Sequence, residues 1–139
     1  MSKSIKLKNE TYIDSSSISH ERVSLNNFLE DTGWRDLPLV TDASTLEWCK
    51  LSYRKIKGIV YINGLFKLNN PTWGKQIGQL PNGCYPSWET DFVCRGVDNS
   101  SVVIAIAPNG QINFLDTVNG VYSAEFVGGI ISVSFIANN

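Results

Sequence analysis

Alternation of apolar and polar residues dominates the chain after about residue 45, and glycine and asparagine separate the alternating runs. Successive side chains of a β-strand point to opposite faces of a sheet, so this pattern is typical of short antiparallel strands with one buried face. In the closing run "IISVSFI", for example, Ile131, Val133 and Phe135 alternate with serines. The pattern predicts a mainly β fold, built as an antiparallel β-sandwich.

Turn signals predict where the strands reverse direction. The runs "SYRKIK" and "IVYINGLFKL" flank Lys57 and Gly58, and glycine can adopt the positive φ that a tight hairpin requires. The run "VVIAIAPNGQINFL" places Asn109 and Gly110 between two apolar segments, which is the strongest short-range hairpin signal. A further "VNG" at residues 118–120 indicates a third turn.

The first third of the chain has a different pattern. The segment "IKLKNETYID" predicts a small hairpin that turns at Asn9 and Glu10. In "SLNNFLED", residues 24–31, a serine precedes apolar residues at helical spacing, which predicts one short capped helix. We therefore expect an amino-terminal shoulder over residues 1–45, with this hairpin and helix, and a β-sandwich head domain over residues 46–139.

Length and charge exclude several classes of partner. The 139 residues suffice for one core, and 12 basic residues against 13 acidic ones create no positive field that would gather nucleic acid. The longest apolar runs are far shorter than the roughly 20 residues that cross a bilayer, and no apolar segment of signal-peptide length follows the first lysines. We expect no nucleic-acid partner, no membrane insertion, no signal peptide and synthesis in a cytoplasm.

Residues suited to catalysis or metal binding are few. The single histidine, His20, lies in a polar segment, which gives little basis for a nucleophile and base pair. Cys49, Cys84 and Cys94 show no C-x-x-C spacing, so they are predicted to be small buried hydrophobes rather than zinc ligands or disulfides. We expect no catalytic residues, no cofactor and no metal.

One pair of carboxylates keeps a hydrolase open as an alternative. Glu89 and Asp91 are two residues apart and would share one face of a strand, close enough to perturb each other. Glycoside hydrolysis uses two carboxyl groups about 5 to 10 Å apart. Spacing in the sequence does not decide between this possibility and a solvated strand face.

Aromatic residues gather in "NNPTWGKQIGQLPNGCYPSWETDF", which predicts long loops rather than core strands. Binding surfaces concentrate in loops on a rigid scaffold, and an aromatic face can stack on a sugar ring while neighbouring polar groups bind its hydroxyls. The predicted saccharide-binding residues are therefore the loop aromatics and the charged residues that follow them: Trp73, Tyr85, Trp88, Glu89, Asp91, Arg95 and Asp98. The alternative is that the aromatics pack against the ends of the sandwich.

Two other groups of residues are predicted to be structural. Trp34 and Trp48 are expected to pack in the core or the shoulder. Arg54, Lys55 and Lys57 are expected on a solvated hairpin edge that discourages pairing between sheets, with an anion site as the alternative.

The strand predicted at Val102 to Ala107 is apolar on both faces. An isolated two-layer sandwich cannot bury both faces of such a strand. A third layer or a neighbouring subunit would cover the second face, so oligomerisation is expected.

In chain order, six segments resemble the tail proteins of phages that infect Gram-positive bacteria. They are "IKLKNETYIDSSSISHERVSLNNFL", "GWRDLPL", "YRKIKGIVYINGLF", "LPNGCYPS", "VVIAIAPNGQINF" and "ISVSFI". The likeness is to the receptor-binding or baseplate (tail-tip) head domains of siphophages and of phage-tail-like bacteriocins, and it covers nearly the whole chain. The matched positions are Tyr53, Arg54 and Gly58 in a recurring hairpin, and Leu80, Pro81, Gly83, Tyr85 and Pro86 in a turn.

This resemblance implies a jelly-roll-like head, commonly a homotrimer, at the tip of a phage tail. Such a head binds bacterial cell-surface or wall saccharides without enzymatic activity, and its amino-terminal segment connects it to other tail or baseplate proteins. The matched positions are structural, because saccharide contacts in these heads lie in loops that vary with the host. The chain lacks the long trimeric stalk of larger members, so a purely structural tail or baseplate component is the alternative function.

Overall fold

The computed structural model of the chain describes residues 5–6, 12–13, 30–118 and 125–138. These residues form strands and no helix, which confirms the mainly β prediction. The strands are β1 (Ile5–Lys6), β2 (Tyr12–Ile13), β3 (Arg35–Asp36), β4 (Ala43–Ser44), β5 (Ser52–Ile56), β6 (Ile59–Asn69), β7 (Gln76–Gln79), β8 (Thr90–Gly96), β9 (Ser101–Ile106), β10 (Gln111–Val118) and β11 (Phe126–Ile136).

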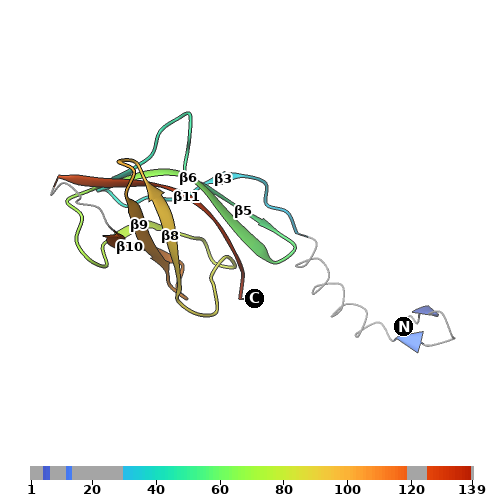
Figure 1. The fold of residues 1–139 in the computed structure, drawn as a ribbon. Coiled ribbons are helices and arrows are strands. Elements are labelled where there is room, and N and C mark those ends of the chain that lie inside the picture. Colours follow the sequence, from blue (N-terminus) through green and yellow to red (C-terminus); the bar gives the residue numbers. More distant parts are fainter. Residues whose placement is uncertain (1–4, 7–11, 14–29, 119–124, 139) are drawn as a thin grey trace.

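Nine of the strands form one antiparallel sheet that curls on itself (Figure 1). The order is β3-β5-β6-β11-β8-β9-β10-β7, and β4 pairs with β6 beside this path. β11 and β8 share only two residue pairs, at Gly129 and Ile130, and β8, β9 and β10 run across the direction of β6 and β11 (Figure 1). The two faces of the predicted sandwich are therefore two halves of one continuous sheet.

The two edges of this sheet approach each other through the residues that follow β3. β3 pairs with β5, whereas Leu39, three residues later, bridges to Gly78 in β7. The amide of Val40 also donates to the carbonyl of Ile77 at 3.0 Å. This connection closes the open side of the curled sheet.

The core lies between the two halves and is built from alternate residues of the longest strands. In β11, Ile131 is buried whereas Ser132 and Ser134 are exposed, as the alternation predicted. The side chains with no exposed surface include Val60, Ile62, Phe66 and Leu68 of β6, Val102, Ile104 and Ile106 of β9, and Ile112 and Phe114 of β10.

The β5–β6 hairpin turns at the two predicted residues. Ile56 pairs with Ile59, and the two residues between them both have positive φ, 51° at Lys57 and 79° at Gly58. This backbone is typical of a type I′ turn, whose twist matches that of the strands it joins. The predicted position is confirmed, and Lys57 adopts the left-handed conformation as well as the glycine.

The β9–β10 hairpin also turns where predicted, with a different geometry. The amide of Gly110 donates to the carbonyl of Ala107 at 2.9 Å, and the amide of Ala107 donates to the carbonyl of Gln111 at 2.9 Å. Gly110 has φ 84° whereas Asn109 does not have positive φ. The turn is a three-residue connection that ends in a glycine bulge, not a two-residue turn.

The amino-terminal third is described only in part. β1 and β2 pair antiparallel, Ile5 with Ile13 and Lys6 with Tyr12, which agrees with the predicted hairpin. Its turn at residues 9–10, His20, residues 24–29 of the predicted helix and residues 119–120 of the third predicted turn lie outside the described residues.

Residues 30–45 lie against the main sheet. β3 pairs with β5 and β4 pairs with β6, and Leu37 between them is buried in the common core. The boundary at residue 45 stays a prediction.

The sequence prediction for the stretch after β6 is wrong. The stretch after β6 was expected to form loops, but it contains β7, where Ile77 and the following Leu80 are fully buried. The sequence pattern does not indicate this strand, because glutamines and Gly78 interrupt the apolar residues. Glycine is required at position 78, since its backbone packs so tightly against Leu37 and Pro38 that no side chain fits.

The two tryptophans expected to be buried are also exposed. Trp34 follows the positive-φ Gly33 and has 49% of its surface exposed, and Trp48 lies in the loop before β5 with 78% exposed. Strands β6, β9 and β10 fill the core without them. Of the three cysteines, all free, Cys84 and Cys94 are buried as predicted and Cys49 is half-buried.

Candidate functional site

An open pocket of about 160 Å³ lies beside β5. Three parts of the chain form its walls: the residues leading into β3, the inward face of β5, and the loop after β7. We call it the β5 pocket, and its lining residues are Glu30, Thr32, Arg35, Tyr53, Lys55, Pro81, Asn82, Gly83 and Cys84.

The β5 wall follows from the alternation of the strand. Tyr53 and Lys55 point inward and are 6% and 5% exposed, whereas Arg54 between them points outward. Lys55 is therefore not on a solvated hairpin edge, and that part of the prediction is wrong. It is the only buried charged residue in the described part of the chain, and it lines the pocket.

The loop wall lies close to the Lys55 ammonium. The amide of Cys84 donates to the carbonyl of Pro81 at 3.1 Å, which closes a turn, and Gly83 has φ 91°. A side-chain carbon at Gly83 would lie 3.9 Å from Lys55 Nζ. The space beside Gly83 would accept a side-chain carbon, so the positive φ of the turn is what favours glycine there.

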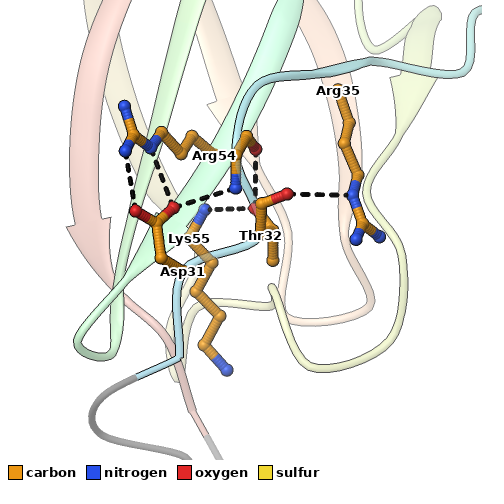
Figure 2. A network of polar contacts seen from close by, with 6 residues as sticks. Asp31, Thr32, Arg35, Arg54 and Lys55 are labelled. Carbon is orange, nitrogen blue, oxygen red and sulfur yellow. Dashed lines mark hydrogen bonds and ion pairs between the residues drawn. The ribbon is translucent and has the colours of Figure 1, made fainter.

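The third wall is the edge segment, residues 30–36, which lies antiparallel along β5. Thr32 fixes it: its amide donates to the Lys55 carbonyl at 3.0 Å, and its Oγ1 accepts from the Lys55 amide at 3.0 Å. Arg35 Nε donates to the Thr32 carbonyl at 3.3 Å. Figure 2 shows these contacts, with the Lys55 side chain pointing away from Asp31 and Arg54.

An ion pair holds the same segment on its outward side. Arg54 Nε donates to Asp31 Oδ1 at 2.9 Å and Nη2 donates to Oδ2 at 2.7 Å, a bidentate contact (Figure 2). The Gly33 amide also donates to Asp31 Oδ1 at 2.8 Å. The hydrogen bonds from Arg54 lower the pKa of Asp31 from 3.8 to about 2, and the bond from Gly33 lowers it in the same direction.

The pocket combines charged groups of both signs with hydroxyl and amide groups. Lys55 and Arg35 are cationic, Glu30 is anionic, and Tyr53 and Asn82 can donate and accept hydrogen bonds. Burial raises the pKa of the Cys84 thiol, and the charge of Lys55 acts in the opposite direction. A cavity of roughly 150 Å³ takes a benzene-sized ring, so the pocket can hold about one six-membered ring.

The residues predicted to bind saccharide come from the loop before β8, from β8 and the turn after it, and from the loop after β6. Tyr85, Trp88 and Glu89 lie near the carboxyl terminus, since the Tyr85 carbonyl accepts from the Asn138 amide at 2.7 Å and Pro86 bridges to Ala137. They follow directly after the pocket loop. Trp88 is 80% exposed, whereas Tyr85 packs against the core.

The other four predicted residues lie on β8, in the turn after it, and in the loop after β6. Asp91 and Arg95 are exposed on the outward face of β8, and Asp98 lies in the turn after it, where Asp98 Oδ1 accepts from the Ser100 amide at 3.1 Å. Trp73, 78% exposed, lies in the loop after β6, whose Gly74 amide donates to the Phe114 carbonyl. Their saccharide-binding role stays a prediction.

The sequence interpretation overlooked most of the β5 pocket. Glu30 and Thr32 precede β3 and Arg35 begins it, and none of the three was identified as a site residue from the sequence. One signal was available: Lys55 has the same parity as Leu51 and Tyr53, so alternation places it on the inward face of the strand. An inward lysine near the end of a strand marks a polar cavity or a buried ion pair.

A second cavity, of about 280 Å³, is almost entirely apolar. We call it the β6 groove, and it lies beside β6. Its lining residues are Ser44, Thr45, Leu46, Leu65, Phe66, Lys67, Val97, Phe126 and Gly128. Lys67 Nζ lies 4.5 Å from the centre of the Phe126 ring. This groove offers contact area and few hydrogen-bonding groups.

The described residues contain neither a metal site nor a membrane-spanning helix. Within the described residues, no group of three His, Cys, Asp or Glu side chains is placed to hold a metal ion. The same part of the chain contains no helix long and apolar enough to cross a membrane.

No protein-family model matches the chain, and no curated protein matches it. Among solved structures, the receptor binding protein gp15 of Listeria phage PSA is similar with a TM-score of 0.61 at 15% identity, over 89% of this chain and 75% of that one. The head domain of phage bIL170, reported with the receptor binding domains of lactococcal phages, gives a TM-score of 0.56 at 17% identity, over 76% of this chain and 98% of that one. The predicted likeness to receptor-binding head domains is confirmed at the level of the fold.

Proposed function

We propose that the chain is the host-recognition module of a phage tail or tail-like particle, and that it binds bacterial cell-surface or wall saccharides without catalysing a reaction. The observation that carries the proposal is its fold, shared with two phage receptor-binding proteins that span most of its length. Fold alone does not determine function, so the chemistry of the pocket has to agree.

The β5 pocket supports saccharide as the ligand. Its volume suits one sugar ring, and its lining offers donors and acceptors on three sides. Trp88, exposed shortly after the pocket loop, gives an aromatic surface of the kind that stacks on sugars. Lys55 and Tyr53 are the pocket groups we expect to contribute most, because both are held on a strand and pre-ordered.

Three copies are proposed to assemble into a homotrimer. The half of the sheet formed by β8, β9 and β10 carries Val93 on its outward face. Val93 is 68% exposed and pairs directly with Val103 of β9. A neighbouring copy would cover these valines, as the apolar character of β9 led us to expect. Three weak sites per trimer would raise overall affinity without new contacts. Light scattering should return three times the chain mass of 15.4 kDa, and a monomer would contradict the trimer.

In the particle, the module would sit at the tail tip, with other tail or baseplate proteins contacting its amino-terminal segment. Binding of fluorescent protein to a panel of Gram-positive cells tests host recognition directly. Lys55→Met should reduce binding by at least about tenfold, since hydrogen bonds to charged groups are worth roughly 1.5 to 3 kcal/mol. Trp88→Ala should also reduce binding, because it removes the exposed aromatic surface. Lys67→Met, an exposed lysine on β6, is the matched control and should bind normally.

A purely structural role in the tail is the second candidate, and the β6 groove favours it. Exposed Leu46, Val97 and Phe126 line this groove, and contiguous apolar surface of this kind often marks a protein contact. A structural component would bind other tail proteins and no cells. Cell binding that is unaffected by Lys55→Met would also contradict the β5 pocket as the recognition site.

A further inference from the structure

The β5 pocket is complete only when the edge segment lies on β5. Glu30, Thr32 and Arg35 belong to that segment, whereas the other walls belong to the sheet and the loop after β7. If residues 30–33 moved away from β5, the pocket would lose one of its three walls. Their position on β5 therefore determines whether a ligand meets an assembled site.

Few contacts hold this part of the chain. Within residues 30–33, the Thr32 amide donates to the Lys55 carbonyl and the Lys57 amide donates to the Glu30 carbonyl at 3.1 Å, while the Lys55 amide donates to the Thr32 side chain. All lie at the edge of the sheet, where the hydrogen bonds are open to water on one side. Segments of this kind open at a lower free energy than the core.

The ion pair between Asp31 and Arg54 adds a bidentate side-chain contact. It lies on the outward side of β5, where the side chains of Arg54 and Asp31 are 32% and 42% exposed, and neither lines the pocket. Asp31 directly precedes the lining residue Thr32, and Arg54 directly precedes the lining residue Lys55. The pair can therefore affect the pocket only by holding the segment in place.

We propose that Asp31 and Arg54 are positioning residues for the β5 pocket, and that ligand binding in the pocket is coupled to docking of the edge segment on β5. By linkage the coupling is reciprocal: a ligand that contacts the segment strengthens its docking by the same factor by which docking strengthens ligand binding. The identity of the ligand rests on the proposed function, whereas the positioning role does not.

This coupling connects the pocket to the amino-terminal segment. Glu30 is the first pocket residue along the chain, so occupation of the pocket changes how firmly this point of the chain is held. In a tail particle, binding at the cell surface would in this way reach the segment proposed to contact the other tail proteins.

The first test needs no ligand, because Cys84 lines the pocket and is 4% exposed. In protein carrying Cys49→Ser and Cys94→Ala, the rate at which Cys84 reacts with iodoacetamide reports how often the pocket wall opens. We expect Arg54→Gln and Asp31→Asn each to raise this rate by about two- to fivefold, the range expected for loss of an exposed ion pair. The exchanged pair Asp31→Arg with Arg54→Asp should restore a slow rate.

A matched control comes from a second exposed ion pair on the same segment, Lys50 Nζ to Asp36 Oδ2 at 2.9 Å. Neither residue lines the pocket, and Asp36 follows Arg35, the last lining residue of the segment, so Lys50→Gln should leave the rate unchanged. Equal rates in wild type, Arg54→Gln and Asp31→Asn would overturn the positioning role. A circular dichroism melt of each variant separates local opening from unfolding. Asp31→Asn keeps an oxygen that can accept from the Gly33 amide, so this variant removes the charge of the ion pair and retains that turn contact.

The second test uses cell-wall polysaccharide extracted from a strain that binds the labelled protein. We expect the polysaccharide to slow the labelling of Cys84 and to bind Arg54→Gln about two- to fivefold more weakly than wild type or Lys50→Gln. Protection of Cys84 with equal affinity for Arg54→Gln would overturn the coupling and leave the proposed function standing. No protection of Cys84, together with faster labelling of the ion-pair variants, would reject the pocket as the recognition site and keep the positioning role.

Discussion

The aromatic ring of Tyr85 lies directly on the Cα of Gly110, in the space that any larger side chain would occupy. Tyr85 comes from the loop before β8 and Gly110 from the β9–β10 turn, so this contact joins two loops at one end of the sheet. It also explains why Tyr85 packs against the core while the nearby Trp88 is exposed.

We expect Gly110→Ala to destabilise the protein by about 3 kcal/mol. Roughly 1 to 2 kcal/mol comes from the left-handed conformation and the rest from displacing the Tyr85 ring. The matched control is Gly58→Ala, at a turn glycine of similar φ with open space around it, which should cost only about 1 kcal/mol. Urea unfolding measures both, and equal costs would mean that the ring yields freely.

Burial should decide the cost of removing two methyl groups from a valine. Val102→Ala, at a fully buried position of β9, should reduce the free energy of unfolding by about 1.5 to 3 kcal/mol. Val93→Ala, on the outward face of β8, should change the stability of the monomer by less than about 0.5 kcal/mol. A similar large loss at both positions would indicate that Val93 is covered, for example by another copy of the chain.

Docking of the edge segment should weaken in acid. The folded-state pKa of Asp31 is about 2, below its ordinary 3.8, so its contribution to docking is complete above pH 3.8 and is lost as the pH falls through about 2. The amide of Gly33, which donates to Asp31, should report this titration in nuclear magnetic resonance spectra. In Arg54→Gln the midpoint should move up toward 3.8, and an unmoved midpoint would show that the ion pair does not form.

The three thiols should react in a fixed order in the folded protein. Burial raises the pKa of Cys94 to about 11 and also raises that of Cys84, whereas Cys49 is half-buried. The thiolate is the reactive form, so at pH 8 iodoacetamide should modify Cys49 first and Cys94 last. Peptide mass spectrometry identifies the sites, and early modification of Cys94 would contradict its burial.

The strands and hairpins were predictable because alternation and turn residues act locally. Gly58 and Gly110 mark turns by their own backbone preferences, and Ile131 is buried in the alternating run that predicted it. β7 was not predictable in this way, because the contact of Gly78 with Leu37 and Pro38 depends on the closure of the sheet. Local patterns carry no information about such long-range packing.

The site was less predictable than the fold for a related reason. Thr32 and Gly83 are brought together by pairing of the edge segment with β5 and by the turn at Pro81. Pro81 and Gly83 were recognised as turn residues, but no local pattern predicts that this turn meets the edge segment. Trp73 and Trp88 were correctly placed in loops, but loop aromatics from different connections need not meet in the fold. Only Lys55 could have been found from its strand parity.

The direction of the edge segment also determines how the domain should resist mechanical tension. Its bonds to β5 run from Glu30, beside the hairpin turn, to Asp36, beside Ser52. Tension on the chain before Glu30, applied parallel to β5, would load these bonds and the Asp31–Arg54 pair simultaneously, in shear. The same tension applied across β5 would peel them apart one at a time. A particle that attaches through this segment would therefore hold its cell most firmly when the pull follows the strand.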